Sequence, residues 1–263
     1  MRTTPHLRPK KFLGQHFLHD RRIAQKIVDS LESGRVPEPV LEIGPGKGVL
    51  TKLLLERNDL DLWVIEIDPQ AVDYLKITFP AVDGRILKGD FLDLDLDALF
   101  RRPFSIIGNL PYNISSQILF KILEHRDKAR QVICMLQKEV ADRIKSGHGN
   151  KTYGILSVLI QAYYRVEPRF TVGAGAFIPP PSITSSVIRL TRLEGSDENY
   201  NQQLFFKVVK QAFNNRRKTL RNAVKNLNLP AEILTLSLLD KRAEQLSVKD
   251  FIHLTRLIQN SSA

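Results

Sequence analysis

The sequence predicts an α/β fold: a mainly parallel sheet with helices on both faces, followed by a small all-helical region. Short apolar strands alternate with segments of helical spacing over most of the 263 residues. Strand patterns then end near residue 192, and only helical spacing follows. Alternation of this kind is typical of parallel strands joined by crossover helices.

The elements are predicted from hydrophobic periodicity and turn residues. An irregular basic arm occupies residues 1–20. The predicted strands are 40–43, 62–67, 86–87, 104–107, 131–136 and 186–191. The predicted helices are 21–33, 49–57, 69–75, 115–124, 138–145, 156–164, 204–228, 232–239 and 248–259.

A polar stretch at 193–199 predicts a linker between two domains. We expect a domain at 1–195, whose first 20 residues form the arm, and a helical domain at 196–263. A chain of this length accommodates one large and one small domain.

The formal net charge of +11 is concentrated at the two ends of the chain. Residues 1–22 carry six Lys or Arg against one Asp, and residues 196–263 carry eleven against six acids. The region between them has 22 against 21. This distribution predicts a polyanionic partner such as nucleic acid. An anionic membrane is the alternative, weakened because no strongly amphipathic segment and no membrane-length apolar run occurs.

The composition also restricts compartment and metal chemistry. The single cysteine, Cys134, excludes a disulfide framework and a Cys-based zinc site, and its apolar surroundings predict a buried thiol. His16 and His19 with Asp20 lack a well-placed further ligand, so no metal site is predicted. No signal-peptide pattern is present, and we expect a cytoplasmic protein.

A glycine-rich loop predicts a nucleotide-like cofactor. Gly44, Gly46 and Gly48 follow a strand and open a helix, and Glu66 ends the next predicted strand 18 residues later. Glycines let the backbone approach a ligand closely, and a carboxylate at this place can accept hydrogen bonds from ribose hydroxyls. Asp90, in the segment 89–91, is a candidate acceptor for an adenine amine. The alternatives are a glycine-rich turn without a ligand and a solvated turn aspartate.

The segment Asn109-Leu110-Pro111-Tyr112 predicts a pocket for a planar heterocycle that carries an exocyclic amine, such as adenine or cytosine. Asn offers a side-chain acceptor, Pro a rigid turn without an N–H, and Tyr a flat aromatic face. An ordinary strand-ending turn remains the alternative.

The glycine loop resembles the loop of S-adenosylmethionine-dependent methyltransferases, and nearly the whole chain resembles the KsgA family of ribosomal RNA adenine N6,N6-dimethyltransferases. The matching segments include 14–18, 41–48, 66–68, 89–90, 109–112, 137–143, 153–158, 177–181, 213–220 and 242–247. The segment 213–220 and the small helical domain favour this family over the related Erm resistance methylases. The chain departs from the common family pattern at His16, where Asn is frequent, and at 182–184.

The resemblance implies a Rossmann-like class I methyltransferase fold and S-adenosylmethionine as cofactor. Its cofactor contacts would fall on His16, Leu18, Gly44, Gly46, Glu66, Ile67, Asp90, Phe91 and Asn109. Its catalytic positions would be Asn109, Leu110, Pro111, Tyr112 and Phe177, where Tyr112 and Phe177 would enclose the target base. RNA contacts would come from Lys10, Lys11, Arg216, Arg217, Lys218, Arg221 and Lys225. The last five lie on the predicted helix 204–228, whose basic face could also be merely solvated.

The implied reaction is dimethylation of N6 of two adjacent adenosines near the 3′ end of 16S rRNA in the small ribosomal subunit. We expect a role in 30S biogenesis, a monomer, and no membrane association. Two alternatives stay open: a non-catalytic assembly factor, and a small-molecule or DNA N6-adenine methyltransferase. The basic helical C-terminal region argues against a small substrate.

Overall fold

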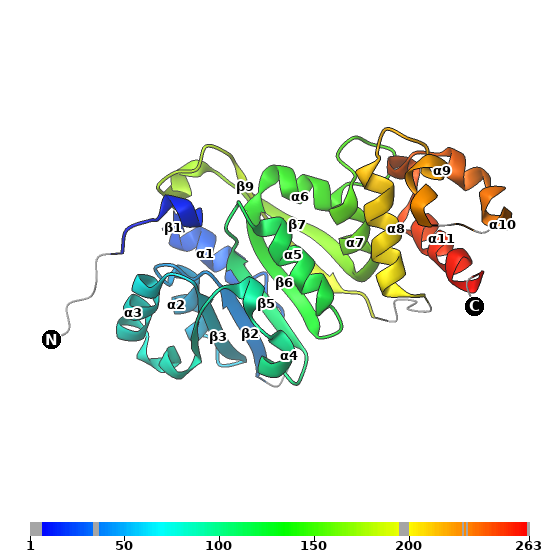
Figure 1. The fold of residues 1–263 in the computed structure, drawn as a ribbon. Coiled ribbons are helices and arrows are strands. Elements are labelled where there is room, and N and C mark those ends of the chain that lie inside the picture. Colours follow the sequence, from blue (N-terminus) through cyan, green and yellow to red (C-terminus); the bar gives the residue numbers. More distant parts are fainter. Residues whose placement is uncertain (1–6, 34–36, 195–199, 228, 230, 262–263) are drawn as a thin grey trace. The chain divides into compact units, whose positions relative to one another are not determined.

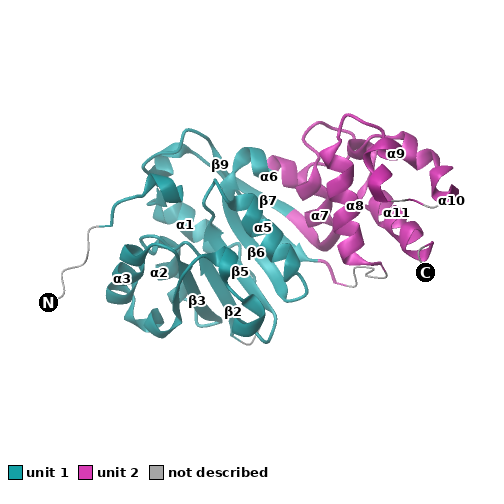
Figure 2. Ribbon diagram, viewed as in Figure 1, with its two compact units in different colours: residues 1–141, 167–192 teal, residues 142–166, 193–263 magenta. Residues whose placement is uncertain are grey.

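The computed structural model describes residues 7–33, 37–194, 200–227, 229 and 231–261. These residues form two compact units (Figure 2). The first contains residues up to Ala141 together with Glu167–Arg192, and the second contains Asp142–Val166 together with the chain from Leu193. The segment Asp142–Val166 therefore clusters with the C-terminal residues, whereas the sequence predicted one division near 193–199.

The larger sheet has seven strands in the order β4-β3-β2-β5-β6-β9-β7 (Figure 1). The strands are β2 (Glu38–Ile43), β3 (Leu60–Glu66), β4 (Ile86–Lys88), β5 (Phe104–Asn109), β6 (Ala129–Gln137), β7 (Tyr164–Val172) and β9 (Ser185–Arg192). The neighbours from β4 to β6 pair in parallel, and β9 pairs antiparallel to β6. A second, two-stranded sheet joins β1 (Phe17–Leu18) to β8 (Phe177–Ile178).

The helices follow the strands much as the periodicity predicts. They are α1 (Arg21–Val28), α2 (Val49–Leu55), α3 (Pro69–Thr78), α4 (Leu96–Leu99), α5 (Ser115–Glu124), α6 (Lys138–Lys145), α7 (Ile155–Tyr163), α8 (Gln202–Asn214), α9 (Leu220–Ala223), α10 (Ala231–Leu234) and α11 (Val248–Asn260). In Figure 1, α5 crosses the near face of the sheet while α1 lies behind it.

The core of the first unit is built on the central strands. Ile106 and Ile107 on β5 and Val132 and Ile133 on β6 are fully buried, as expected for parallel strands covered on both faces. Cys134 is also fully buried, which confirms the predicted buried thiol, and this burial raises its pKa to about 12. The thiol is therefore neutral at physiological pH.

Two predicted helices of the second unit are interrupted. The predicted helix 204–228 ends at Asn214 and resumes only as the short α9 and a 3-10 turn at Lys225–Leu227. The amide of Leu220 donates to the carbonyl of Lys241, and Thr219 bridges to Arg242, so tertiary pairing replaces helical hydrogen bonds. The predicted helix 232–239 is likewise reduced to α10 and a 3-10 turn at Ser237–Asp240.

Helix α1 also ends earlier than predicted. Asp20 caps its start by accepting from the amides of Arg22 and Ile23. After Val28 the chain turns away, and the amide of Glu32 donates to the side chain of Gln131 on β6. Residues 29–33 therefore lie outside the helix, and Glu32 is joined to a distant strand.

The parallel strands bring three of the predicted site positions to one edge of the sheet. Gly44 follows β2, Glu66 ends β3 and Asn109 ends β5, and these three strands are neighbours with β2 in the middle. Ligands of open α/β sheets bind at the carboxyl ends of the strands. The fold therefore places the predicted cofactor loop and the Asn109 turn at the edge where such a site is expected.

Candidate active site

The glycine loop has a backbone that side chains would disfavour. Gly44, Gly46 and Gly48 have φ values of 63°, 55° and 73°, in the left-handed region. A Cβ atom on Gly46 would lie 2.8 Å from the ring of Phe17, whereas one on Gly44 would meet nothing within 4 Å. Gly46 thus allows the N-terminal arm to pack on the loop, and the backbone at Gly44 borders open space.

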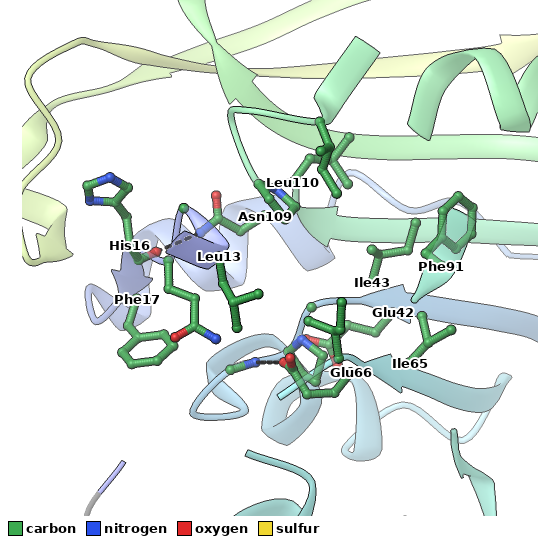
Figure 3. Close-up of a pocket in the computed structure, with 18 of the residues that line it drawn as sticks. Leu13, His16, Phe17, Glu42, Ile43, Ile65, Glu66, Phe91, Asn109 and Leu110 are labelled. Atoms are coloured by element: carbon green, nitrogen blue, oxygen red, sulfur yellow. Dashed lines mark hydrogen bonds between the residues drawn. The ribbon is translucent and has the colours of Figure 1, made fainter. Parts of the chain in front are cut away.

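A cavity of about 250 Å³ lies between this loop, the N-terminal arm and the Asn109 turn (Figure 3). It has room for far more than one water molecule. The predicted site residues that line it are His16, Leu18, Gly44, Gly46, Glu66, Ile67, Asp90, Phe91, Asn109, Leu110, Pro111 and Tyr112. The structure therefore brings together every predicted cofactor position and four of the five predicted catalytic positions.

Phe177 is the fifth, and it does not line the cavity. Its side chain is only 2% exposed and packs in the hydrophobic core, while Phe177 pairs with Leu18 in the small sheet. In this conformation its ring is closed off by core neighbours. The enclosure of a base between Tyr112 and Phe177 stays a prediction.

Glu66 is held by the backbone of the loop beside it. Its Oε2 accepts from the Gly46 amide at 3.2 Å, and its Oε1 accepts from the Asp68 amide at 2.9 Å (Figure 3 shows the first of these). Burial raises the pKa of Glu66, and these two hydrogen bonds oppose that rise. The carboxyl group is therefore fixed in orientation at the end of β3.

Glu42 is a second buried carboxyl group in the cavity wall, and the sequence did not single it out as a ligand contact. Its Oε2 accepts from the Thr51 hydroxyl at 2.6 Å, and its Oε1 has no partner among the described residues. Burial raises its pKa to about 8, with a smaller contribution from the charge of Glu66. Glu42 is therefore largely protonated at neutral pH.

Of the two polar atoms in the Asn109 side chain, one has a hydrogen-bond partner and the other has none among the described residues. Its Nδ2 donates to the backbone carbonyl of His16 at 2.9 Å, which ties the turn to the arm (Figure 3). Its Oδ1 is buried and has no hydrogen-bond partner among the described residues. Buried polar atoms are rarely left without a partner, so this oxygen is an open hydrogen-bond acceptor.

The remainder of the turn is fixed by its own contacts. The Leu110 amide donates to the Met135 carbonyl at 2.9 Å, and the hydroxyl of Tyr112 is 2.5 Å from Oγ of Ser185. The rings of Tyr112 and His16 stack with centroids 5.5 Å apart and planes 22° apart. Since His16 Nδ1 lies 2.8 Å from the Pro179 carbonyl, Nδ1 is the protonated nitrogen that donates.

Asp90 and Phe91 border the cavity after β4, as predicted. Oδ1 of Asp90 accepts from the Leu92 amide at 2.8 Å, so part of its role is to cap a short 3-10 turn. Phe91 is 4% exposed and lies beneath the ammonium of Lys121 at 5.7 Å. Ile67, by contrast, is 45% exposed at the end of β3.

The predicted RNA-contacting residues divide into two groups. Arg216 donates to Glu244 at 2.7 Å and to the Lys151 carbonyl at 2.6 Å, and Arg221 donates to Asp240 at 2.7 Å. The side chains of Lys11, Arg217, Lys218 and Lys225 are exposed. The five residues of the second unit do not share one long helix, because Arg216, Arg217 and Lys218 lie in the turn between α8 and α9.

Lys10 has a different environment from the one predicted for an RNA contact. Its ammonium donates to Oδ1 of Asp68 at 2.7 Å, and the Asp68 side chain is fully buried. The sequence predicts a helix start at Asp68, but nothing in it indicates that Lys10 contacts this residue.

No helix in the part of the chain that the structure describes is long and apolar enough to span a membrane.

Comparisons with known proteins agree with this geometry. The profile of the family "Ribosomal RNA adenine dimethylase" matches residues 6–260. A "Ribosomal RNA small subunit methyltransferase A" from Parabacteroides distasonis is 52% identical over 254 residues, covering 96% of this chain and 95% of that protein. One of the same name from Cytophaga hutchinsonii is 50% identical over 252 residues, covering 96% and 98%.

Solved structures show the same fold. A dimethyladenosine transferase from Plasmodium falciparum superposes with a TM-score of 0.77 at 25% identity, covering 94% of this chain and 98% of that one. The 23S rRNA methyltransferase ErmE superposes with a TM-score of 0.71 at 23% identity, covering 92% and 99%. The sheet is thus that of class I methyltransferases, and the chain belongs to the ribosomal RNA adenine dimethylase family, whose members are S-adenosylmethionine-dependent enzymes that act on ribosomal RNA.

Proposed function

We propose that this protein transfers methyl groups from S-adenosylmethionine to N6 of two adjacent adenosines near the 3′ end of 16S rRNA in the small ribosomal subunit. The observation that carries the proposal is the buried Oδ1 of Asn109, which has no partner among the described residues and belongs to a residue that lines the same cavity as Glu66. An acceptor at this place suits an exocyclic amine that must be presented to a methyl donor. The names of the relatives support the choice of substrate.

The residues present fit S-adenosylmethionine. A Cβ atom at Gly44 would meet nothing within 4 Å, so the backbone there leaves room for the amino acid portion of the cofactor. Glu66 is oriented to accept hydrogen bonds from the ribose hydroxyls. Asp90 and Phe91 would hold the adenine by a hydrogen bond and apolar contact. When bound, the cofactor supplies an electrophilic methyl group on a sulfonium, which is already a good leaving group.

The protein's part in the reaction is to hold the amine. The N6 lone pair of adenine is delocalised into the ring, so N6 is a poor nucleophile. In our proposal Asn109 Oδ1 and the Leu110 carbonyl accept its two N–H bonds and bias the nitrogen toward tetrahedral geometry. Positioning of this kind can contribute roughly 7 kcal/mol or more to the barrier reduction. Each transfer releases one proton from N6 to solvent. After the first transfer the monomethyl amine therefore keeps a single N–H, which the same acceptors would hold for the second.

The target adenine must leave its stack to reach this turn. Tyr112 offers a ring on which it would stack, a contact worth roughly 1–3 kcal/mol per base. The ring of His16 now lies against Tyr112, and it would share or yield that place when a base enters. The backbone of Phe177 pairs with Leu18 and thereby also supports the arm.

We further propose that the enzyme acts on the 30S particle as a monomer in the cytoplasm and contributes to 30S biogenesis. The exposed Arg217, Lys218 and Lys225 support the contact with the 30S particle, because exposed cations on one unit suit rRNA phosphates.

The test is methyl transfer from labelled S-adenosylmethionine to 30S particles that lack adenine dimethylation. The wild-type protein should label N6 of two adjacent adenosines. Asn109→Ala should reduce kcat at least about 100-fold, as removal of one preorganised polar group does elsewhere. Asn58→Ala, an exposed asparagine at the opposite end of β3, should match the wild type.

Transfer retained by Asn109→Ala at the wild-type rate would contradict the assigned role of Asn109. No transfer by the wild type despite tight, salt-sensitive 30S binding would instead favour the non-catalytic assembly factor.

A further inference from the structure

Lys10 and Asp68 form an ion pair that joins the N-terminal arm to the cofactor edge of the sheet. The Lys10 ammonium lies 2.7 Å from Asp68 Oδ1, and the two residues are 58 positions apart in the sequence. The Asp68 side chain is fully buried and that of Lys10 is 28% exposed. A buried carboxylate needs compensation of its charge, and Lys10 is the cation that supplies it.

Asp68 belongs to the same hydrogen-bonded chain as Glu66. Its backbone amide donates to Glu66 Oε1 at 2.9 Å, and its carboxylate accepts from the Gln70 amide at 3.0 Å to cap α3. Burial raises the pKa of Asp68, but the hydrogen bonds from Lys10 and Gln70 outweigh it, and the net pKa is lowered. The carboxylate therefore stays charged, and its position is coupled to that of Glu66.

Further hydrogen bonds within the arm surround this ion pair. The Lys10 amide donates to Gln15 Oε1 at 2.9 Å, and Gln15 Nε2 lies 3.5 Å from Asp68 Oδ2. Gly14, with a φ of 63°, turns the chain between them. The residues that follow, His16 to Leu18, enter the cavity wall. The placement of these wall residues thus depends on the anchor that Lys10 provides.

We propose that Lys10 is a positioning residue for S-adenosylmethionine: through Asp68 it fixes both the arm and the amide that orients Glu66. The inference rests on the proposed function. Lys10 acts through Asp68 and not by contact with RNA. Its neighbour Lys11 is exposed and makes no ion pair among the described residues, so Lys11 is the lysine available to a phosphate.

The two adjacent lysines provide a matched pair of variants. S-adenosylmethionine binding is measured by calorimetry on the free protein, and 30S binding by filter retention. Lys10→Met should weaken cofactor binding about tenfold, roughly the effect of one lost hydrogen bond to a charged group. It should raise KM for the cofactor while kcat and 30S affinity stay within about twofold. Lys11→Met should leave cofactor binding unchanged and weaken 30S binding.

Two further variants separate positioning from stability. Lys10→Arg keeps the charge and should recover most of the cofactor affinity. The double variant Lys10→Met/Asp68→Asn removes the unpaired buried charge, and Asn can still cap α3. Its thermal midpoint should recover toward the wild type while its cofactor affinity remains about tenfold weaker.

The inference is overturned if Lys10→Met binds the cofactor as the wild type does, or if it weakens 30S binding as much as Lys11→Met. Full recovery of cofactor affinity in the double variant would also overturn it, because the effect would then be one of fold stability alone. If the wild-type protein binds the cofactor but methylates no rRNA, the proposed function fails instead, and the calorimetric comparison still decides the role of Lys10.

Discussion

Glu42 shows how a single buried side chain makes stability depend on pH. Its pKa rises from 4.5 to about 8 because burial disfavours the charged form. Between these values the folded protein retains a proton that the unfolded chain has lost. The stabilising contribution is therefore complete below about pH 4.5 and is lost as the pH rises toward 8.

We expect Glu42→Gln to remove this dependence. Gln keeps an acceptor for the Thr51 hydroxyl but carries no charge at any pH. The wild type should lose up to about 1.4 kcal/mol of unfolding free energy per pH unit through this group between pH 4.5 and 8. Urea unfolding of the cofactor-free protein from pH 5.5 to 9 measures it. The unfolding free energy of the variant should rise relative to that of the wild type up to pH 8, and the difference should then stay constant. A constant difference over the whole pH range would contradict the assignment.

The sequence predicted the site residues that lie at strand ends and missed those that depend on distant pairing. Glu66 and Asn109 could be located because parallel strands present their carboxyl ends at one edge. The pairing of Lys10 with Asp68 could not, because it joins an irregular arm to a helix cap across 58 positions. The burial of Phe177 in the core was not predicted either, because its neighbours there are distant in sequence.

At the scale of elements, the turn between α8 and α9 decides which cations are free. Periodicity alone continues from 204 to 228, but the Leu220 amide pairs with the Lys241 carbonyl and breaks the helix. Arg216 and Arg221 are thereby brought to Glu244 and Asp240. These two arginines form ion pairs within the second unit, whereas Arg217, Lys218 and Lys225 remain exposed.

We therefore expect different phenotypes from the two groups. Substitution of Arg217, Lys218 or Lys225 by Ala should each reduce the slope of log K for 30S binding against log salt by about one, with the thermal midpoint unchanged. Arg216→Ala should lower the thermal midpoint, because Glu244 and the Lys151 carbonyl lose their donor. Binding at several salt concentrations, together with thermal melts, measures both. An unchanged slope in all three exposed variants would remove these residues from the RNA interface.

At the scale of the whole molecule, the domain boundary was predicted from local composition. In the structure, α7 clusters with the second unit. The linker signal at 193–199 is local, and it contains no information on which partner covers an earlier helix. Tyr163 on α7 is fully buried, with its ring 6.2 Å from that of Phe205 and 6.4 Å from that of Phe206. Tyr153 similarly meets Phe213 at 5.9 Å.

Truncation after residue 195 should consequently damage the part that remains. It removes α8, which covers the aromatic residues of the segment Asp142–Val166. Each large side chain that becomes exposed loses roughly 1.5–3 kcal/mol of burial free energy. We expect the thermal midpoint to fall by at least about 5 °C and a dye for exposed apolar surface to bind. The full-length Arg217→Ala/Lys218→Ala/Lys225→Ala variant should show neither change, since it removes only exposed charge. A truncated chain that melts at the wild-type temperature without dye binding would mean that α7 needs no cover from α8, and that the linker at 193–199 is the working boundary.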